Sequence, residues 1–176
     1  MKFFNTEVKT FIILFFFLTN AYSNEKIVYI DMNVLINTSK AGVSINNQMK
    51  KLVDQNNKEY EKLEKKLVNE ENELLKKKNV IDPQQFNEEI KNFQTKIKEF
   101  RNERKKKIDG ISNKNITAKN ELVDYVTKIL AEYSAKNEIS LILNKESIII
   151  GKKDNDITEK ILTLLNDKVK NIKLKN

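Results

Sequence analysis

Apolar residues recur every three or four positions along most of this chain. Between Lys40 and Lys78 the series is interrupted at Asn56, where an apolar residue is due. This interruption is a stutter in a heptad pattern, which unwinds a supercoil locally. Residues 37–39 precede the series and offer hydroxyl and amide groups that can cap a helix. The pattern predicts one long helix beginning near Lys40, with a seam formed by Ile45, Met49, Leu52, Tyr60, Leu63, Leu67 and Leu74.

A second and longer helical pattern follows Pro83, the only proline in the sequence. Two seven-residue series are interleaved there, as in helices that pack against each other. They predict a helix from Gln84 to Lys136. Gly110 lies inside it and is either a bend point or a glycine tolerated on a solvated face. The two series are Phe86, Phe93 and Phe100, then Ile90, Ile97, Arg104, Ile111, Ala118 and Tyr125, with Leu122 and Ile129 shifted by about one position.

The residues between these two patterns are typical of a chain reversal. Three lysines at 76–78 suit a helix C-terminus, where the backbone dipoles favour cations. Asp82 is a good N-cap, and Pro83 suits the first turn of the helix that follows. The sequence therefore predicts an antiparallel helical hairpin with its tip near residues 79–83.

Short segments rich in β-branched residues flank the helical pattern. Residues 27–34 predict a strand that is buried largely on both faces. Residues 139–143 and 147–150 surround a three-residue turn and predict a β-hairpin that ends at Gly151. Asp156 and Glu159 have the spacing of a capping box at the start of a last helix. That helix is expected to bury Ile157, Ile161, Leu164, Leu165 and Val169.

These elements predict a mainly α protein with a small β part. A long antiparallel helical hairpin, the coiled-coil arm at residues 41–129, is inserted into a β-rich base made of residues 24–40 and 130–176. A base of about 60 residues without disulfides is marginally stable alone. We therefore expect an obligate oligomer assembled through the base. The expected oligomerisation residues are Ile27, Val28, Tyr29, Ile30, Met32, Ile139, Leu141, Leu143, Ile148, Ile149 and Ile150.

Residues 1–23 have the pattern of a cleaved secretory signal peptide. Lys2 and Lys9 give a basic start, residues 11–18 are an apolar run, and small residues at Ala21 and Ser23 precede the expected cut. The apolar run is far shorter than the roughly 20 residues of a membrane-spanning helix. An uncleaved anchor is the alternative. The pattern predicts export from the cytosol.

The composition limits the chemistry that the chain can perform. There is no histidine or cysteine, which excludes Cys/His zinc sites, thiolate nucleophiles, disulfides and Ser-His-Asp triads. A carboxylate-only metal or acid–base site is the remaining catalytic option, and no paired-acid motif stands out among the charged residues. We expect no enzyme activity, no bound metal and no cofactor.

The net charge favours acidic partners. Without residues 1–23 the chain has 31 Lys and Arg against 24 Asp and Glu, a net charge of +7. A positive surface attracts anionic partners over long range. Because export makes nucleic acid an improbable partner, acidic polypeptides and anionic lipid head groups fit better.

Several segments, in this order and behind a signal peptide, resemble the Skp-like (OmpH family) periplasmic chaperones of Gram-negative bacteria. The resemblance covers the whole chain after the signal peptide. It implies a homotrimer, in which three bases form a β-barrel-like body and three arms enclose a central space. It also implies binding of unfolded outer-membrane proteins in the periplasm without ATP, and no catalytic residues. The segments that carry it are residues 27–32, 39–42, 139–144, 147–150, 156–158 and 164–166, together with the charged hairpin.

Two groups of arm residues are candidates for binding an unfolded client. One is a basic run in the second helix, and the other is a mixed basic and apolar group at the tip. Both also have simpler interpretations, namely a solvated helix face, compensation of the helix dipole, and, for the phenylalanine, a place in the seam. The candidates are Arg101, Arg104, Lys105, Lys106 and Lys107 in the run, and Lys76, Lys77, Lys78, Val80, Ile81 and Phe86 at the tip.

The main rival to a holdase chaperone is an exported structural protein, a coiled-coil spacer or envelope tether. The arm fits both functions equally well. The strand-bearing ends and the reversal at Pro83 favour the chaperone, because a spacer would favour one continuous helix.

Overall fold

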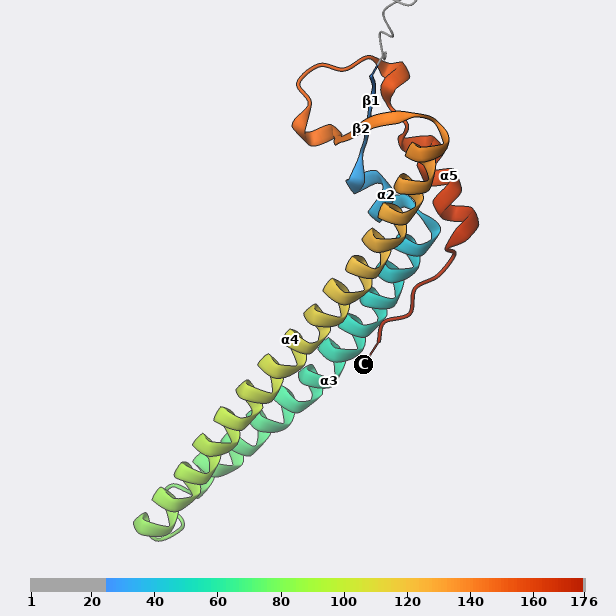
Figure 1. Cartoon of the computed structure of the whole chain (residues 1–176). Coiled ribbons are helices and arrows are strands. Elements are labelled where there is room, and N and C mark those ends of the chain that lie inside the picture. Colours follow the sequence, from blue (N-terminus) through green and yellow to red (C-terminus); the bar gives the residue numbers. More distant parts are fainter. Residues whose placement is uncertain (1–24, 176) are drawn as a thin grey trace, which may run out of the picture.

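Two long antiparallel helices dominate the computed structural model, which describes residues 25–175 (Figure 1). Helix α3, Lys40–Lys77, has 38 residues, and helix α4, Pro83–Lys136, has 54. The chain is mainly helical with a small β part, as the sequence predicts. The predicted signal peptide lies outside the described residues. Within residues 25–175, no helix combines the length and the apolar character needed to cross a membrane.

Both long helices begin at the caps that the sequence predicts. The Ser39 hydroxyl accepts a hydrogen bond from the Gly42 backbone N–H at 3.1 Å. The Asp82 carboxylate accepts from the N–H groups of Gln84 at 2.8 Å and Gln85 at 3.3 Å, and Pro83 is the first helical residue. These side chains satisfy N–H groups that have no partner inside the helix.

The apolar seam holds the hairpin together along its length. Tyr60 of α3 packs on Phe100 of α4 with their ring centroids 5.6 Å apart. Asn56, at the stutter, is only 5% exposed, and its Oδ1 has no hydrogen-bond partner among the described residues. Tyr125, which the pattern placed in the seam, is 39% exposed, and Val126 is buried instead. The seam therefore shifts by one residue near the base, because a straight helix drifts relative to a seven-residue repeat.

The base contains a two-stranded parallel sheet. Strand β1, Lys26–Ile30, pairs with strand β2, Ile139–Asn144, in a register that places Ile27 opposite Leu141. Parallel strands cannot be joined by a tight turn and need a crossover connection. Here the crossover contains the whole helical arm, so both ends of the arm return to the same small sheet.

Two of the predicted strand segments are wrong. The first strand ends at Ile30, because the Asp31 side chain accepts from the Val34 N–H at 3.1 Å and caps a short helix. Met32 is therefore the first residue of helix α2, Met32–Thr38, and not a strand residue. The predicted β-hairpin is absent from the described residues, since Lys145–Ser147 form a 3₁₀ turn (η1) and residues 148–150 join no strand.

The core of the base lies where α2, the end of α4 and helix α5, Thr158–Lys168, meet the sheet. A second 3₁₀ turn, η2 at Lys153–Asn155, leads into α5. The N-cap of α5 is Ile157 and not the predicted Asp156, although Asp156 accepts from the Thr158 N–H at 3.0 Å. The predicted capping box also fails, since the Asp156 N–H donates to the Lys153 carbonyl and not to Glu159. The largest fully buried apolar side chains are Leu35, Ile45, Leu122, Val126, Ile161 and Leu165.

The last residues continue beyond α5 as an irregular segment that follows α3 (Figure 1). We call residues 169–175 the tail. Its side chains Val169 and Ile172 are buried, at 7% and 3% exposure. The sequence pattern predicted no element for this segment beyond Val169.

Candidate functional site

The sheet of the base presents an uncovered apolar face. Side chains alternate between the two faces of a strand. Val28 and Ile30 point into the protomer core and are 3% exposed, whereas Ile27 is 43% exposed. On β2, Leu141 and Leu143 are 47% and 36% exposed. Of the expected oligomerisation residues, Val28, Ile30 and Ile139 are buried, Tyr29, Met32 and Ile148 are half-buried, and the other five are exposed.

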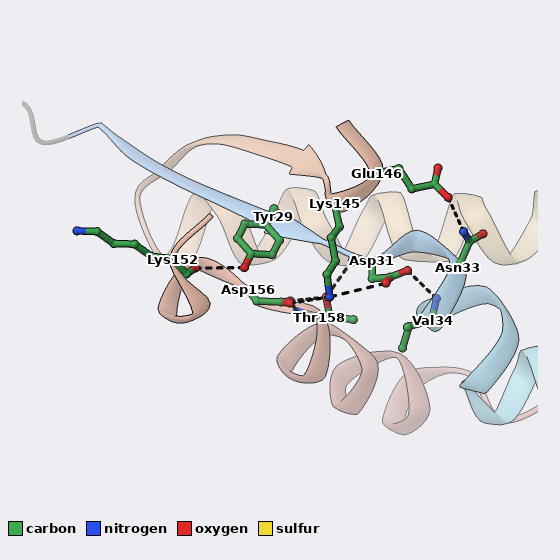
Figure 2. Close-up of polar contacts among 9 residues, drawn as sticks. All are labelled: Tyr29, Asp31, Asn33, Val34, Lys145, Glu146, Lys152, Asp156 and Thr158. Carbon is green, nitrogen blue, oxygen red and sulfur yellow. Dashed lines mark hydrogen bonds and ion pairs between the residues drawn. The ribbon is translucent and has the colours of Figure 1, made fainter. Parts of the chain in front are cut away.

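The segment after β2 adds the most exposed apolar side chains of the base. Ile149 is 99% exposed and Ile150 is 91% exposed. The segment is held against β1, since the Tyr29 hydroxyl donates to the Lys152 carbonyl at 3.2 Å (Figure 2). A Cβ atom at Gly151 would lie 2.8 Å from the Tyr29 ring, so this close packing depends on glycine. We call the group Ile27, Leu141, Leu143, Ile149 and Ile150 the apolar surface of the base.

A polar cluster ties the ends of β1 and β2 to the start of α5 (Figure 2). The Lys145 ammonium lies 3.9 Å from the Asp31 carboxylate and 3.4 Å from the Asp156 carboxylate. The Thr158 hydroxyl accepts from the Asp31 N–H at 2.9 Å and donates to Asp156. Nearby, the Asn33 amide donates to Glu146 at 2.6 Å. The cluster fixes the geometry of the sheet from which the apolar surface projects.

The pKa of Asp156 is lowered from its ordinary value. Partial burial alone would raise the pKa, but the hydrogen bonds from Thr158 and Lys145 and the charge of Lys145 outweigh it. In the unfolded chain an aspartate has a pKa of about 4, and above that pH a carboxylate with a lower pKa in the folded state stabilises the protein. This stabilisation is lost as the pH falls from about 4 through the lower pKa of the folded state. The cluster should therefore weaken below about pH 4.

Replacing Asp156 with alanine is expected to cost about 1 kcal/mol of unfolding free energy at pH 7, because a carboxylate that accepts hydrogen bonds from Thr158 and pairs with Lys145 is lost. The difference from the unmutated protein should shrink below about pH 4, where Asp156 itself becomes protonated. Urea unfolding followed by circular dichroism between pH 3 and pH 7 measures this. Asp154→Ala, on the neighbouring exposed turn, is the matched control. A difference that stays constant over this pH range contradicts the assigned cause.

The tip of the arm presents apolar and basic side chains side by side. Val80 is 80% exposed and Leu75 is 56% exposed, whereas Ile81 and Phe86 are half-buried. Among the basic residues, Lys76 pairs with Glu73 at 2.7 Å, Lys77 pairs with Glu89 at 3.0 Å, and Lys78 is the C-cap of α3. Two of the three lysines therefore have carboxylate partners within the arm itself.

The basic run of α4 does not form one continuous face. Arg104 faces the seam, where its guanidinium lies 5.8 Å from the centre of the Tyr60 ring and 4.0 Å from Glu64. The other four members are exposed. Residues four apart on a helix share a face, so Arg101 and Lys105 lie together, while Lys106 and Lys107 point to its two sides. The free basic surface of the run is therefore narrower than the sequence suggested.

Sequence reasoning missed the contacts that the tail makes with α3 and α4. Gln48 contacts the tail backbone through both its amide nitrogen and its amide oxygen. The only signal in the sequence was the recurrence of apolar residues at Val169, Ile172 and Leu174 in an otherwise charged segment. Within the described residues, no cluster of acidic side chains has the geometry to hold a metal ion.

The fold is a small base with a long two-helix arm. Comparisons with known proteins identify the family to which a chain with this fold belongs. The model of the family described as "Outer membrane protein (OmpH-like)" matches residues 26–165. The chain therefore belongs to the OmpH-like family. The comparison with curated proteins found no match.

Among solved structures, one from Caulobacter crescentus, described as an OmpH-like outer membrane chaperone, has a TM-score of 0.79 at 16% sequence identity. The alignment covers 90% of this chain and 94% of that chain. At this identity the likeness establishes the shared fold.

Proposed function

We propose that this protein is an ATP-independent holdase chaperone that binds unfolded outer-membrane proteins in the periplasm and prevents their aggregation. The proposal rests on one observation. The chain belongs to the OmpH-like family, and its long arm extends from a base that has an uncovered apolar surface. The name of the Caulobacter crescentus structure as an outer membrane chaperone supports it. The predicted signal peptide supports the periplasmic location.

The base is the assembly point of a homotrimer in this proposal. Its apolar surface has five large side chains, each at least 36% exposed, around a two-stranded sheet in which the outer edge of β2 has no neighbouring strand among the described residues. Clustered apolar side chains and unpaired strand edges favour association with another chain. Copies of the same base can cover these side chains, and residues 148–150 can pair with strands of a neighbouring copy.

The arms hold the client in this proposal. Helix α3 alone extends roughly 60 Å, so several arms can surround a large unfolded chain. Exposed apolar side chains such as Leu75 and Val80 offer weak, non-specific contacts near the tip. The net positive charge attracts acidic segments and accelerates encounter. Contacts of these two kinds suit a client without a fixed structure.

The test is an aggregation assay with the chain that lacks residues 1–23. A denatured outer-membrane protein is diluted into buffer with and without it, and light scattering is recorded. We expect scattering to be suppressed near one trimer per client, and native mass spectrometry of the same sample to show the trimer. Unchanged scattering overturns the holdase proposal and favours the alternative, an exported coiled-coil structural or envelope-tethering protein.

The same assay tests the basic side chains of α4. Arg101→Gln with Lys105→Gln removes two neighbouring charges and should weaken capture of an acidic client, mainly at low ionic strength. Lys50→Gln with Lys51→Gln removes the same charge from exposed positions of α3 and is the control. Equal capture by the two double variants would exclude a local role for the basic side chains of α4. In a separate experiment, vesicles with anionic lipids are added to test whether lipid head groups compete with the client for binding.

A further inference from the structure

The tail binds the arm in a manner typical of an extended peptide in a groove. Burial alternates over its last four residues, since Ile172 is buried, Lys173 is exposed, Leu174 is half-buried and Lys175 is exposed. This alternation is the pattern of a strand with one covered face. In Figure 1 the tail runs alongside α3 toward the middle of the arm.

Gln48 of α3 contacts the tail backbone through both ends of its side-chain amide. Its Nε2 donates to the Ile172 carbonyl at 2.8 Å, and its Oε1 accepts from the Leu174 N–H at 3.3 Å. The side chain thus offers one donor and one acceptor to an extended chain, as the peptide group of a neighbouring strand does. These contacts do not depend on the side chains of the bound segment.

Neighbouring residues hold Gln48 in place and add further contacts. Gln48 Nε2 lies 3.1 Å from the Ser44 hydroxyl, and Ser44 donates to Asn171 Oδ1 at 2.9 Å. At the far end, Lys175 pairs with Glu121 of α4 at 2.6 Å. We call the surface lined by Ser44, Gln48 and Glu121 the tail groove.

We propose that the tail groove is a peptide-binding site that the tail occupies at rest, and that it accepts extended segments of unfolded outer-membrane proteins with alternating apolar residues. The proposal rests on the proposed function. Its basis is the match between what the groove holds and what such clients contain. Strands of outer-membrane barrels alternate apolar and polar residues, and Ile172 to Lys175 has the same alternation.

The tail acts as a tethered competitor in this arrangement. A tethered segment has an effective concentration in the millimolar range, so a short free peptide displaces it poorly. An unfolded client contains many alternating segments and binds other parts of the arm as well. It therefore competes where a single peptide does not. The tail lies beyond residues 26–165, which the family model matches.

The experiment measures binding of a fluorescent peptide with the sequence of residues 169–176 to the full chain without residues 1–23. The double substitution Asn171→Ala with Lys175→Ala removes two exposed contacts of the tail, with Ser44 and with Glu121, and so weakens its binding. The apolar residues Val169 and Ile172 are not mutated. We expect anisotropy to show binding about tenfold tighter to this double variant than to the unmutated chain. Adding Gln48→Ala should remove the gain. A peptide with serine in place of Ile172 and Leu174 is the control ligand, and circular dichroism checks that each variant is folded.

The second step adds a urea-denatured outer-membrane protein, diluted into the peptide complex. Displacement of the peptide by the client, and not by a folded soluble protein, supports the proposal. A peptide that binds the loosened variant but is not displaced shows that the groove serves the tail alone and overturns the proposal. Absence of peptide binding to the loosened variant overturns it as well. Aggregation suppression by the unmutated chain is measured separately, so failure of the holdase function and failure of the groove are distinguished.

Discussion

Replacing Gly42 with alanine is expected to destabilise the protein by at least about 3 kcal/mol, because the new methyl group has no space. A Cβ atom at this position would lie 1.8 Å from the carbonyl oxygen of Ile36 and 2.8 Å from its carbonyl carbon. Both are backbone atoms of α2, so a rotamer change cannot relieve the clash. Either α2 or the start of α3 must move, and the core around Leu35 must open.

Urea unfolding followed by circular dichroism at a fixed protein concentration measures this loss. Concentration is held constant because association stabilises the folded state. Gly110→Ala is the matched control in the same arm, since no atom among the described residues beyond its own helix turn lies within 4 Å of a Cβ built there. It should raise the unfolding free energy by about 1 kcal/mol, as expected of Gly→Ala inside a helix. Equal effects of the two substitutions contradict the close approach of α2 and α3.

The long hairpin could be predicted from sequence because its signals are local. A helix seam repeats every few residues, and a cap is read from one side chain and the residues that follow it. Asp82 and Pro83 therefore mark the reversal, and Ser39 marks the start of α3, through residue types and spacing alone. The drift of the seam at Tyr125 is the exception, since it depends on how closely α4 follows a straight path near the base.

The base was predicted less well because its pairing is non-local. β1 pairs with a strand more than 100 residues away, and period-two alternation does not specify which strand lies beside which. The predicted first strand was too long because Asp31, placed within the apolar run, caps a helix. The sequence also could not show which apolar side chains of the sheet face the protomer's own core and which stay uncovered.

In the candidate site, too, features with a local sequence signal were predicted and contacts between distant residues were not. A run of basic residues is easily found in a sequence, but only the fold shows that Arg104 contacts Tyr60 and Glu64 of the opposite helix. The contact between Gln48 and the tail joins positions 124 residues apart. No local pattern marks a glutamine for such a contact.

Replacing Leu122 with alanine is the second substitution for which we expect a large loss, about 3 kcal/mol of unfolding free energy. Leu122 is 0% exposed and belongs to the core cluster that contains Ile45 of α3 and Leu165 of α5. Truncation removes buried apolar atoms and leaves a cavity, which costs 2–5 kcal/mol in well-packed cores, about 3 kcal/mol at a typical site. Because Leu122 lies where the arm joins the base, the loss of unfolding free energy measures how much this core stabilises the junction of arm and base.

Leu75→Ala is the matched control, since it removes the same atoms from a side chain that is 56% exposed near the tip. Its effect on stability should stay within about 0.5 kcal/mol, as for other surface substitutions. Urea unfolding at several protein concentrations measures both variants and separates the loss in the protomer from a change in assembly. If Leu122→Ala unfolds at the same urea concentration as Leu75→Ala, the arm is not anchored through this core.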